Sequence, residues 1–251
     1  METQRPQPGQ GPLYRQVRER LVRDIAAGHF PPGEPLPSEQ RLAERFGVAQ
    51  GTVRRALEDL RRENLVVRQQ GKGTFVRTHD LDRARFHFFH LVTDDGARRL
   101  PTSRVLGVTR RRANQDEALK LDLTQGGAQG GQGGRVIAIE RVRDLQGRPA
   151  IFETVIVPQE PFADLATIPA ASLPNTLYML FQERFGVSIH RAVEKIRAVA
   201  AGPDEVRHLG MDRGAPLLEI ERLALTFDGQ PVELRISRCD TRDHAYLSDL
   251  V

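Results

Sequence analysis

Two arginines and two glutamates stand in positions from which they could hold a small anion. Arg141 and Arg143 alternate with Val142 in a stretch predicted to be a strand, so both side chains point to one sheet face. Glu153 lies on the next predicted strand, and Glu233 lies near the end of the chain. Two guanidiniums on one face can fork around a phosphate or carboxylate, while the glutamates could bind hydroxyls or an amine. The same spacing fits cross-strand ion pairs on a solvated face, and spacing alone does not decide between the two.

A second set of polar residues lies between residues 36 and 76. Gln50 and Arg54 lie on the outer face of a predicted helix whose apolar residues recur at helical spacing. Ser38 precedes a shorter helix, and a glycine-tipped hairpin with Lys72 follows the longer one. Such helices suit the major groove of DNA, and helix N-termini suit its phosphates. Arginine-rich helix faces are often merely solvated, but two helices, a glycine turn and a wing together favour DNA binding.

The positive charge of the chain is concentrated in its first part. The 251-residue chain carries a net charge of +4. Residues 1–78 hold 14 of the 37 Lys and Arg residues and 9 of the 33 Asp and Glu residues, which gives +5, and the remainder carries −1. A basic segment beside a nearly neutral one indicates a polyanionic partner for the first segment alone.

Three helices and a hairpin must position the DNA-facing set. Apolar residues at helical spacing predict the helices, Ser38 is a good N-cap for the second, and Gly47 makes the turn before the third. Two short strands around a glycine-rich tip at 69–73 predict the hairpin. The predicted bounds are 13–27, 39–46 and 50–63 for the helices and 65–68 and 74–77 for the strands.

Strands and a few helices must position the anion-binding set. Strands joined by turns predict an α+β unit with a mostly antiparallel sheet. We predict a leader over 1–11, a DNA-binding domain over 12–77, a linker over 78–85 and a second domain over 86–251. In the second domain the predicted strands are 103–112, 135–144, 149–157, 188–201, 217–227 and 231–239, and the predicted helices are 116–121, 176–185 and 203–209.

Several kinds of chemistry find no support in the sequence. A single cysteine, Cys239, excludes an internal disulfide and a multi-cysteine zinc site. The seven histidines are scattered, and the glycine-rich stretch 125–134 lacks the P-loop pattern and is expected to be a loop. No apolar run of about eighteen residues predicts a membrane span, and the polar N-terminus lacks the features of a signal peptide. We therefore expect a cytoplasmic protein with no catalytic residue, metal or cofactor.

The first part of the chain resembles the DNA-binding domain of GntR-type bacterial transcription regulators through LPSEQRLAERFGV, TVRRAL and QGKGTFV. The resemblance covers about residues 12–77 and implies a winged helix-turn-helix. It also implies that the starts of the second and third helices and the wing tip contact bases and phosphates. With Arg55 added from the outer helix face, the predicted DNA contacts are Ser38, Gln40, Gln50, Thr52, Arg54, Arg55, Gln70, Gly71 and Lys72.

Two of these positions depart from the family pattern. The family usually has arginine where this chain has Gln40, and Ser/Thr-Arg where it has Ala49-Gln50. Arginine pairs two-pronged with guanine, whereas glutamine pairs two-pronged with adenine. We therefore predict an operator richer in adenine at those steps and weaker binding in salt. The alternative is that both glutamines contact only water or phosphate.

The second part is similar to the effector-binding UTRA domain of the HutC subfamily through RVLGVTRRRA, IERVRDLQGRPAIFETVIVP, TLYMLFQERFGVSIHRAVEKIRA and PLLEIERLALTFDGQPVEL. The likeness spans about residues 87–250 and implies a sheet resembling the chorismate lyase fold, without that activity. Thr176 stands where serine is usual and Cys239 stands near a common tyrosine, so the ligand is expected to differ from a hexosamine phosphate. The resemblance implies ligand contacts at Arg141, Arg143, Glu153, Thr176, Tyr178 and Glu233, with Phe89 and His90 helping to close the site.

These features together predict a homodimeric transcription repressor. A small anionic metabolite, a sugar phosphate or carboxylate, would release it from double-stranded operator DNA. Arg141→Ala is expected to abolish release without weakening operator binding. Two alternatives stay open: a ligand-independent DNA-binding dimer, and an enzyme acting on an aromatic acid, for which no paired acid and base or nucleophile is visible.

Overall fold

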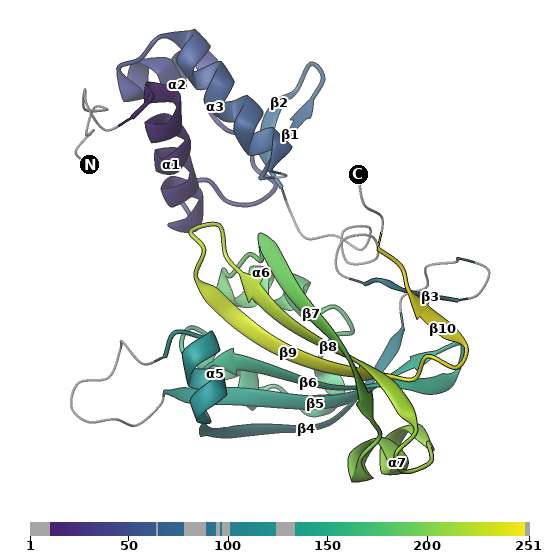
Figure 1. Cartoon of the computed structure of the whole chain (residues 1–251). Coiled ribbons are helices and arrows are strands. Elements are labelled where there is room, and N and C mark those ends of the chain that lie inside the picture. The colour runs from purple at the N-terminus through teal and green to yellow at the C-terminus, as the bar shows by residue number, and fades with distance from the viewer. Residues whose placement is uncertain are drawn as a thin grey trace. The chain divides into compact units, whose positions relative to one another are not determined.

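The computed structural model describes residues 11–63, 65–77, 89–93, 96, 101–123 and 134–248. The chain divides near residue 78 into two compact units (Figure 1), and each is described by itself. The predicted linker at 78–85 lies outside the described residues, as do the predicted leader at 1–11 and the predicted loop at 125–134 except for Gly11 and Gly134. These three predictions therefore stay untested.

The N-terminal unit consists of three helices and a small antiparallel hairpin. The helices are α1 (Leu13–Ala26), α2 (Glu39–Phe46) and α3 (Gln50–Arg62), followed by β1 (Val66–Gln69) and β2 (Gly73–Val76), as Figure 1 shows. Their apolar residues, among them Leu21, Leu42, Val53 and Leu60, pack into one buried core. The predicted elements are confirmed, with bounds that differ by one residue at most.

Local contacts explain how α2 and the wing are held. Ser38 Oγ accepts a hydrogen bond from the backbone N–H of Arg41 at 3.3 Å, and Gly47 ends α2 with a φ of 65°. The proline-rich segment before α2 runs along β2, where the Leu36 N–H donates to the Thr74 carbonyl at 2.7 Å. The wing therefore has a third, strand-like edge that the sequence pattern did not predict.

The C-terminal unit is built on a six-stranded antiparallel sheet with the order β4-β5-β6-β9-β8-β7. The strands are β4 (Thr102–Arg112), β5 (Arg135–Leu145), β6 (Arg148–Pro158), β7 (Arg191–Ala200), β8 (Pro216–Leu225) and β9 (Pro231–Cys239). The accompanying helices are α5 (Gln115–Lys120), α6 (Leu177–Phe185) and α7 (Pro203–Leu209), with 3₁₀ turns at Ala163–Thr167 and Ala170–Ser172. The predicted α+β fold class is confirmed, although the strand predicted to start at residue 188 starts at Arg191.

One face of this sheet carries a polar band between two apolar clusters. Along β6 the residues on this face are Ile151, Glu153, Val155 and Val157 in turn. Val155 and Val157 belong to a buried cluster that includes residues of α6 and the first 3₁₀ turn. Ile151 belongs to a second cluster that includes residues of β3 (Leu91–Thr93) and Tyr246 of β10 (His244–Tyr246). The band that contains Glu153 is thus enclosed along the strand on both sides.

Candidate functional site

Two of the predicted DNA contacts at the start of α3 share one acidic partner. Gln50 Nε2 donates to Glu39 Oε2 at 3.3 Å, and Arg54 Nε donates to the same oxygen at 3.0 Å. The Arg54 side chain is 65% exposed. Because an exposed ion pair contributes little stability, a DNA phosphate can replace Glu39 as the partner of Arg54 at small cost. Glu39 therefore holds the Gln50 and Arg54 side chains at the N-terminus of α3 and leaves them able to exchange Glu39 for DNA.

The other helix positions surround this pair. Gln40 is exposed in the first turn of α2 and donates to Glu44 at 3.3 Å. Thr52 is half-buried in the first turn of α3, and Ser38 caps α2. Helix N-termini present backbone N–H groups without intrahelical partners, which suit phosphate oxygens. The geometry is compatible with the predicted contacts, and their individual roles remain predictions.

The wing tip and Arg55 differ in how they are held. Gln70, Gly71 and Lys72 form an exposed turn, in which Gly71 has a φ of 74°, a conformation that favours glycine. The Arg55 guanidinium instead lies 4.1 Å from the centre of the Tyr14 ring on α1, within the range of a cation–π interaction. Arg55 is thus positioned by a residue of α1, whereas the wing tip is exposed to solvent.

In the C-terminal unit, the structure connects six of the eight predicted effector residues through one buried network. Glu153 is its centre: Arg141 Nε and Ser237 Oγ donate to its two oxygens, the second at 2.9 Å. Nitrogens of Arg235 and Arg143 lie 3.6 Å and 3.9 Å from Glu153 Oε1. Burial alone would raise the pKa of Glu153, but the Arg141 and Arg235 guanidiniums hold it well below its usual range. Glu153 is therefore a buried carboxylate.

Glu233 is the second acidic member of the network. Arg235 donates to both of its oxygens, at 3.0 Å and 2.7 Å, and the Tyr178 hydroxyl donates to Oε1 at 2.8 Å. Burial and then the charge of Glu233 raise the pKa of Tyr178, so its hydroxyl stays protonated and remains a donor. Burial alone would lower the pKa of Arg235, but the carboxylates of Glu233 and Glu153 raise it. This half of the network is fully paired.

Arg143 is paired less completely. Its Nη2 donates to Asn175 Oδ1 at 3.2 Å, and the Phe89 ring centre lies 5.5 Å from its guanidinium carbon. Its Nε is buried without a hydrogen-bond partner among the described residues. Burial, and then the neighbouring Arg141 guanidinium, lower the pKa of Arg143 to about 9. The described surroundings of Arg143 thus leave its positive charge only partly compensated.

A charge balance follows from these contacts. Among the described residues, the network contains three arginines (Arg141, Arg143 and Arg235) and two glutamates (Glu153 and Glu233), and all five are buried. The neighbouring pair of Arg222 and Glu194 is neutral in sum. One positive charge is therefore in excess, and a buried excess charge is costly unless a counter-ion is present. An anionic ligand would supply that counter-ion.

The structure shows the surroundings of other residues of the predicted site. One alternative was that these residues form ion pairs on a solvated sheet face. Arg141 and Glu153 do form an ion pair, but the face is not solvated, because Arg141 is 1% and Glu153 2% exposed. Thr176 Oγ1 donates to Met179 Sδ at 3.3 Å, and the His90 ring packs 5.2 Å from the Tyr246 ring; the roles of Thr176 and His90 in ligand binding stay predictions. Burial raises the pKa of the Cys239 thiol, which agrees with a core residue rather than a nucleophile.

Three members of the network were not predicted from the sequence. Arg235 and Ser237 alternate with Glu233 on β9, so the period of two that joined Arg141 with Arg143 would have found them. Asn175 Nδ2 donates to the Pro101 carbonyl at 2.6 Å and thereby orients Oδ1 toward Arg143. Its role depends on a contact between distant segments, for which the local sequence carries no signal.

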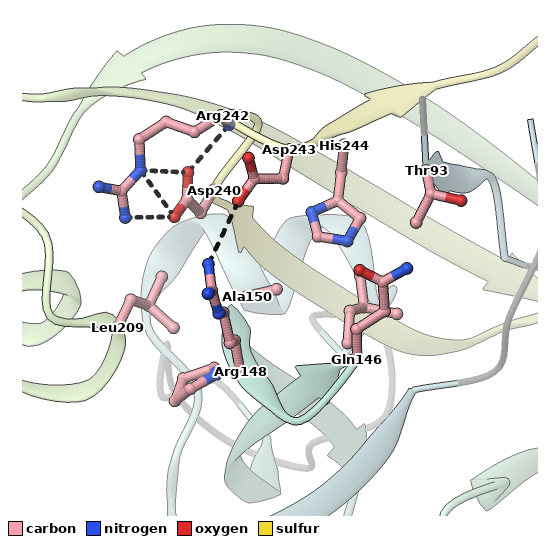
Figure 2. Close-up of a pocket in the computed structure, with 11 residues that line it drawn as sticks. Thr93, Gln146, Arg148, Ala150, Leu209, Asp240, Arg242, Asp243 and His244 are labelled. Carbon is pink, nitrogen blue, oxygen red and sulfur yellow. Dashed lines mark hydrogen bonds and ion pairs between the residues drawn. The ribbon is translucent and has the colours of Figure 1, made fainter. Parts of the chain in front are cut away.

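A separate hollow of about 860 Å³ lies beside the turn between β5 and β6. Figure 2 shows its polar side chains, and none of the eight predicted effector residues lines it. Arg242 is bonded to Asp240 at distances down to 2.6 Å, and Arg148 lies 3.9 Å from Asp243 (Figure 2). Its charges are thus paired within the hollow, in contrast to the excess charge of the network around Glu153.

Comparison with known families identifies both units. Residues 13–76 match the family described as bacterial regulatory proteins, gntR family, and residues 96–245 match the UTRA domain. The chain belongs to the GntR family. A GntR DNA-binding domain followed by a UTRA domain is the arrangement of the HutC subfamily, so this GntR/UTRA protein is a DNA-binding transcription regulator. The resemblance described from sequence motifs is confirmed.

Several transcription regulators are similar to this GntR/UTRA chain over most of its length. The HTH-type transcriptional regulator SmoD of Agrobacterium fabrum is 30% identical over 240 residues, covering 96% of this chain and 97% of SmoD. The HTH-type transcriptional repressor NagR of Bacillus subtilis is 30% identical over 223 residues and 88% of each chain. Because these relatives are regulators, the expectation of a regulator rather than an enzyme is confirmed.

Solved structures agree with this assignment. The ligand-binding domain of a GntR-family transcriptional regulator from Bordetella bronchiseptica is 33% identical, with a TM-score of 0.58, covering 66% of this chain and 99% of that one. YydK of Bacillus subtilis shares the fold at 20% identity and a TM-score of 0.54, over 94% of this chain and 99% of that one. Among the described residues, no helix is long and apolar enough to cross a membrane.

Proposed function

We propose that this GntR/UTRA regulator is a homodimeric cytoplasmic repressor that leaves its operator when a small anionic metabolite binds in the UTRA domain. Repression is supported by the names of its relatives, among them NagR and the mannosyl-D-glycerate transport/metabolism system repressor MngR of Escherichia coli. MngR is 29% identical over 242 residues. Mannosyl-D-glycerate carries a carboxylate, which is one of the two anionic groups proposed for the effector.

The observation that carries the proposal is the excess positive charge of the buried network. Arg143 keeps its Nε without a described partner, while Glu153 and Glu233 are engaged by the other two arginines. An anion placed against Arg143 would neutralise this excess and gain charge-assisted hydrogen bonds. Regulation further requires that the anion bind the DNA-competent and DNA-incompetent states with different affinity, since otherwise it shifts no equilibrium.

The dimer rests on the form of DNA recognition. A single winged helix-turn-helix reads one half-site, and two-fold symmetric proteins read pseudo-palindromes. We expect two copies of the chain on two half-sites. Light scattering of the free protein and of its complex with an operator selected from random duplexes measures this directly. A single copy bound to the selected duplex would contradict the dimer.

A thermal-shift panel tests the effector class. Sugar phosphates, sugar acids and neutral sugars are added to the full chain, and the expectation is that only anionic compounds raise Tm, because a ligand of the native state alone stabilises it. Arg143→Gln is the matched variant and should abolish the shift. It is a cleaner test than Arg141→Ala, since the removal of Arg141 also breaks its pair with Glu153. Stabilisation by neutral sugars alone would contradict the proposal.

A further inference from the structure

The strand next to Arg143 carries a second buried polar atom without a hydrogen-bond partner. In the described part of the chain, Ser103 Oγ and Arg143 Nε are both buried and both lack such a partner. They are not scattered, because Ser103 of β4 and Arg143 of β5 are directly paired in the antiparallel register. Buried polar groups in native proteins are nearly always satisfied, so two unsatisfied ones at one register position call for an explanation.

The pairing places the Ser103 and Arg143 side chains on the sheet face that carries the buried network around Glu153. Directly opposite residues in an antiparallel pair project to the same side, with Cβ atoms about 4.5–5.5 Å apart. Arg143 in turn shares its face with Arg141 and Glu153. One further contact holds the two strands here: Asn175 bridges the Arg143 guanidinium and the carbonyl of Pro101, two residues before Ser103. Ser103 therefore borders the part of the network where the positive charge is in excess.

Both groups can donate to an acceptor that the described residues do not supply. Arg143 Nε carries an N–H and has no acceptor capacity, while a serine hydroxyl can donate or accept. Ser103 could have satisfied Arg143 by accepting from it, yet neither atom is bonded to the other. An oxygen that accepts from both would satisfy two buried groups at once and bring the missing negative charge.

We propose that Ser103 is an effector-binding residue whose hydroxyl, together with Arg143 Nε, donates to one oxygen of the anionic group of the ligand. This rests on the proposed function, since it assumes that the network around Glu153 is the effector site. The chemistry shared by both possible sources is an anionic oxygen, from a phosphate or from a carboxylate. Ser103 then belongs with Arg143 to the part of the site that recognises the anion, whereas Glu153 and Glu233 are paired with Arg141 and Arg235.

The proposal predicts opposite effects of one substitution on stability and on affinity. Ser103→Ala removes a buried hydroxyl that has no hydrogen-bond partner among the described residues, so the Tm without ligand should stay the same or rise. The same substitution removes a donor to a charged acceptor, so anion affinity should fall about tenfold. A residue that matters only for packing would not raise stability and lower affinity together.

The experiment is an NMR titration of the full chain with inorganic phosphate and, separately, with acetate. The Arg143 Nε–Hε signal is assigned by its loss in Arg143→Lys, and its shift reports an anion at that atom. We expect wild type to show this shift with at least one of the two anions, which also distinguishes phosphate from carboxylate recognition. Ser103→Ala should bind that anion about tenfold more weakly. Ser103→Thr, which keeps the hydroxyl, and Thr102→Ala, at an exposed neighbouring position, should bind it as wild type does.

The results of the titration distinguish the role of Ser103 from the existence of the anion site. If the Arg143 signal shifts equally in wild type and in Ser103→Ala, with equal affinity, the role of Ser103 is overturned while the anion site stands. If neither anion moves the signal in wild type, both the role of Ser103 and the proposed anion site are overturned. If Ser103→Ala lowers affinity but also lowers Tm, and Ser103→Thr does not restore affinity, then Ser103 is a packing residue and the proposal is wrong.

Discussion

The two units of this regulator use arginine in opposite ways. In the N-terminal unit Arg54 is 65% exposed and paired with Glu39 on the surface, where partners exchange readily. In the C-terminal unit Arg141 is 1% exposed and bound to a carboxylate that is itself buried. A surface arginine needs no buried counter-ion before a large polyanion binds, because water solvates its charge in the unbound protein. A buried arginine must be balanced within the fold, and any excess charge selects a ligand small enough to enter.

The largest expected effect follows from removing a buried counter-charge. Glu153→Gln leaves Arg141, Arg143 and Arg235 with one carboxylate fewer, and breaking a buried ion pair typically costs about 3–5 kcal/mol. We expect the free energy of unfolding, measured with urea, to fall by about that amount. Glu140→Gln, at an exposed position of β5, is the control and should change it by less than about 0.5 kcal/mol. Equal free energies of unfolding for the two variants would contradict the claim that the buried charge of Glu153 contributes more stability than the exposed charge of Glu140.

The pH dependence of this difference has a defined sign. The pKa of Glu153 is held below its usual range in the folded protein, so the carboxylate contributes stability above the ordinary carboxyl pKa of about 4.3. This contribution is lost progressively as the pH falls below that value toward the lowered one. Wild type and Glu153→Gln should therefore differ fully at pH 7 and converge toward pH 3, as measured by urea unfolding across this range. A difference that grows on acidification would show that Glu153 is not the stabilising carboxylate.

A smaller effect is expected for base recognition by the exposed unit. Gln50 is placed at the start of α3 by its contact with Glu39, and a two-pronged contact with adenine is worth about 1–3 kcal/mol of discrimination. Selection of binding sites from random duplexes should yield half-sites with adenine at this step, and Gln50→Ala should lose that preference. If both proteins select the same guanine-bearing half-site, the predicted base contact is wrong.

The smallest effect is expected for a phosphate contact. Arg54→Ala should weaken binding similarly on all duplex sequences and reduce the slope of log K against log salt by about one, because one fewer counter-ion is released. Its fold should be unaffected, since the exposed pair with Glu39 contributes little stability. Fluorescence anisotropy at several salt concentrations measures the slope. A loss confined to one duplex sequence would instead indicate a base contact.

The contrast also explains what the sequence could predict. Helical and alternating periodicities predicted the bounds of the helices and of the six main strands to within three residues, and alternation placed Arg141 and Arg143 on one face. Periodicity does not tell whether a face is covered, because the cover comes from distant segments. Here the clusters that flank the network draw on α6 and on β3 and β10, which pair residues 91–93 with 244–246. Strands of three residues are too short to show a period, so the enclosure of the network was not predictable.

The most direct test of the account is the release of operator DNA by an anionic ligand. A selected operator duplex is labelled, bound by the full chain, and titrated with the compound that gives the largest thermal shift, while anisotropy is recorded for wild type and Arg143→Gln. We expect equal operator affinity for the two proteins without ligand, release of wild type, and no release of Arg143→Gln at the same concentrations. Normal release of Arg143→Gln would contradict the claim that the excess charge of the buried network is what the effector neutralises.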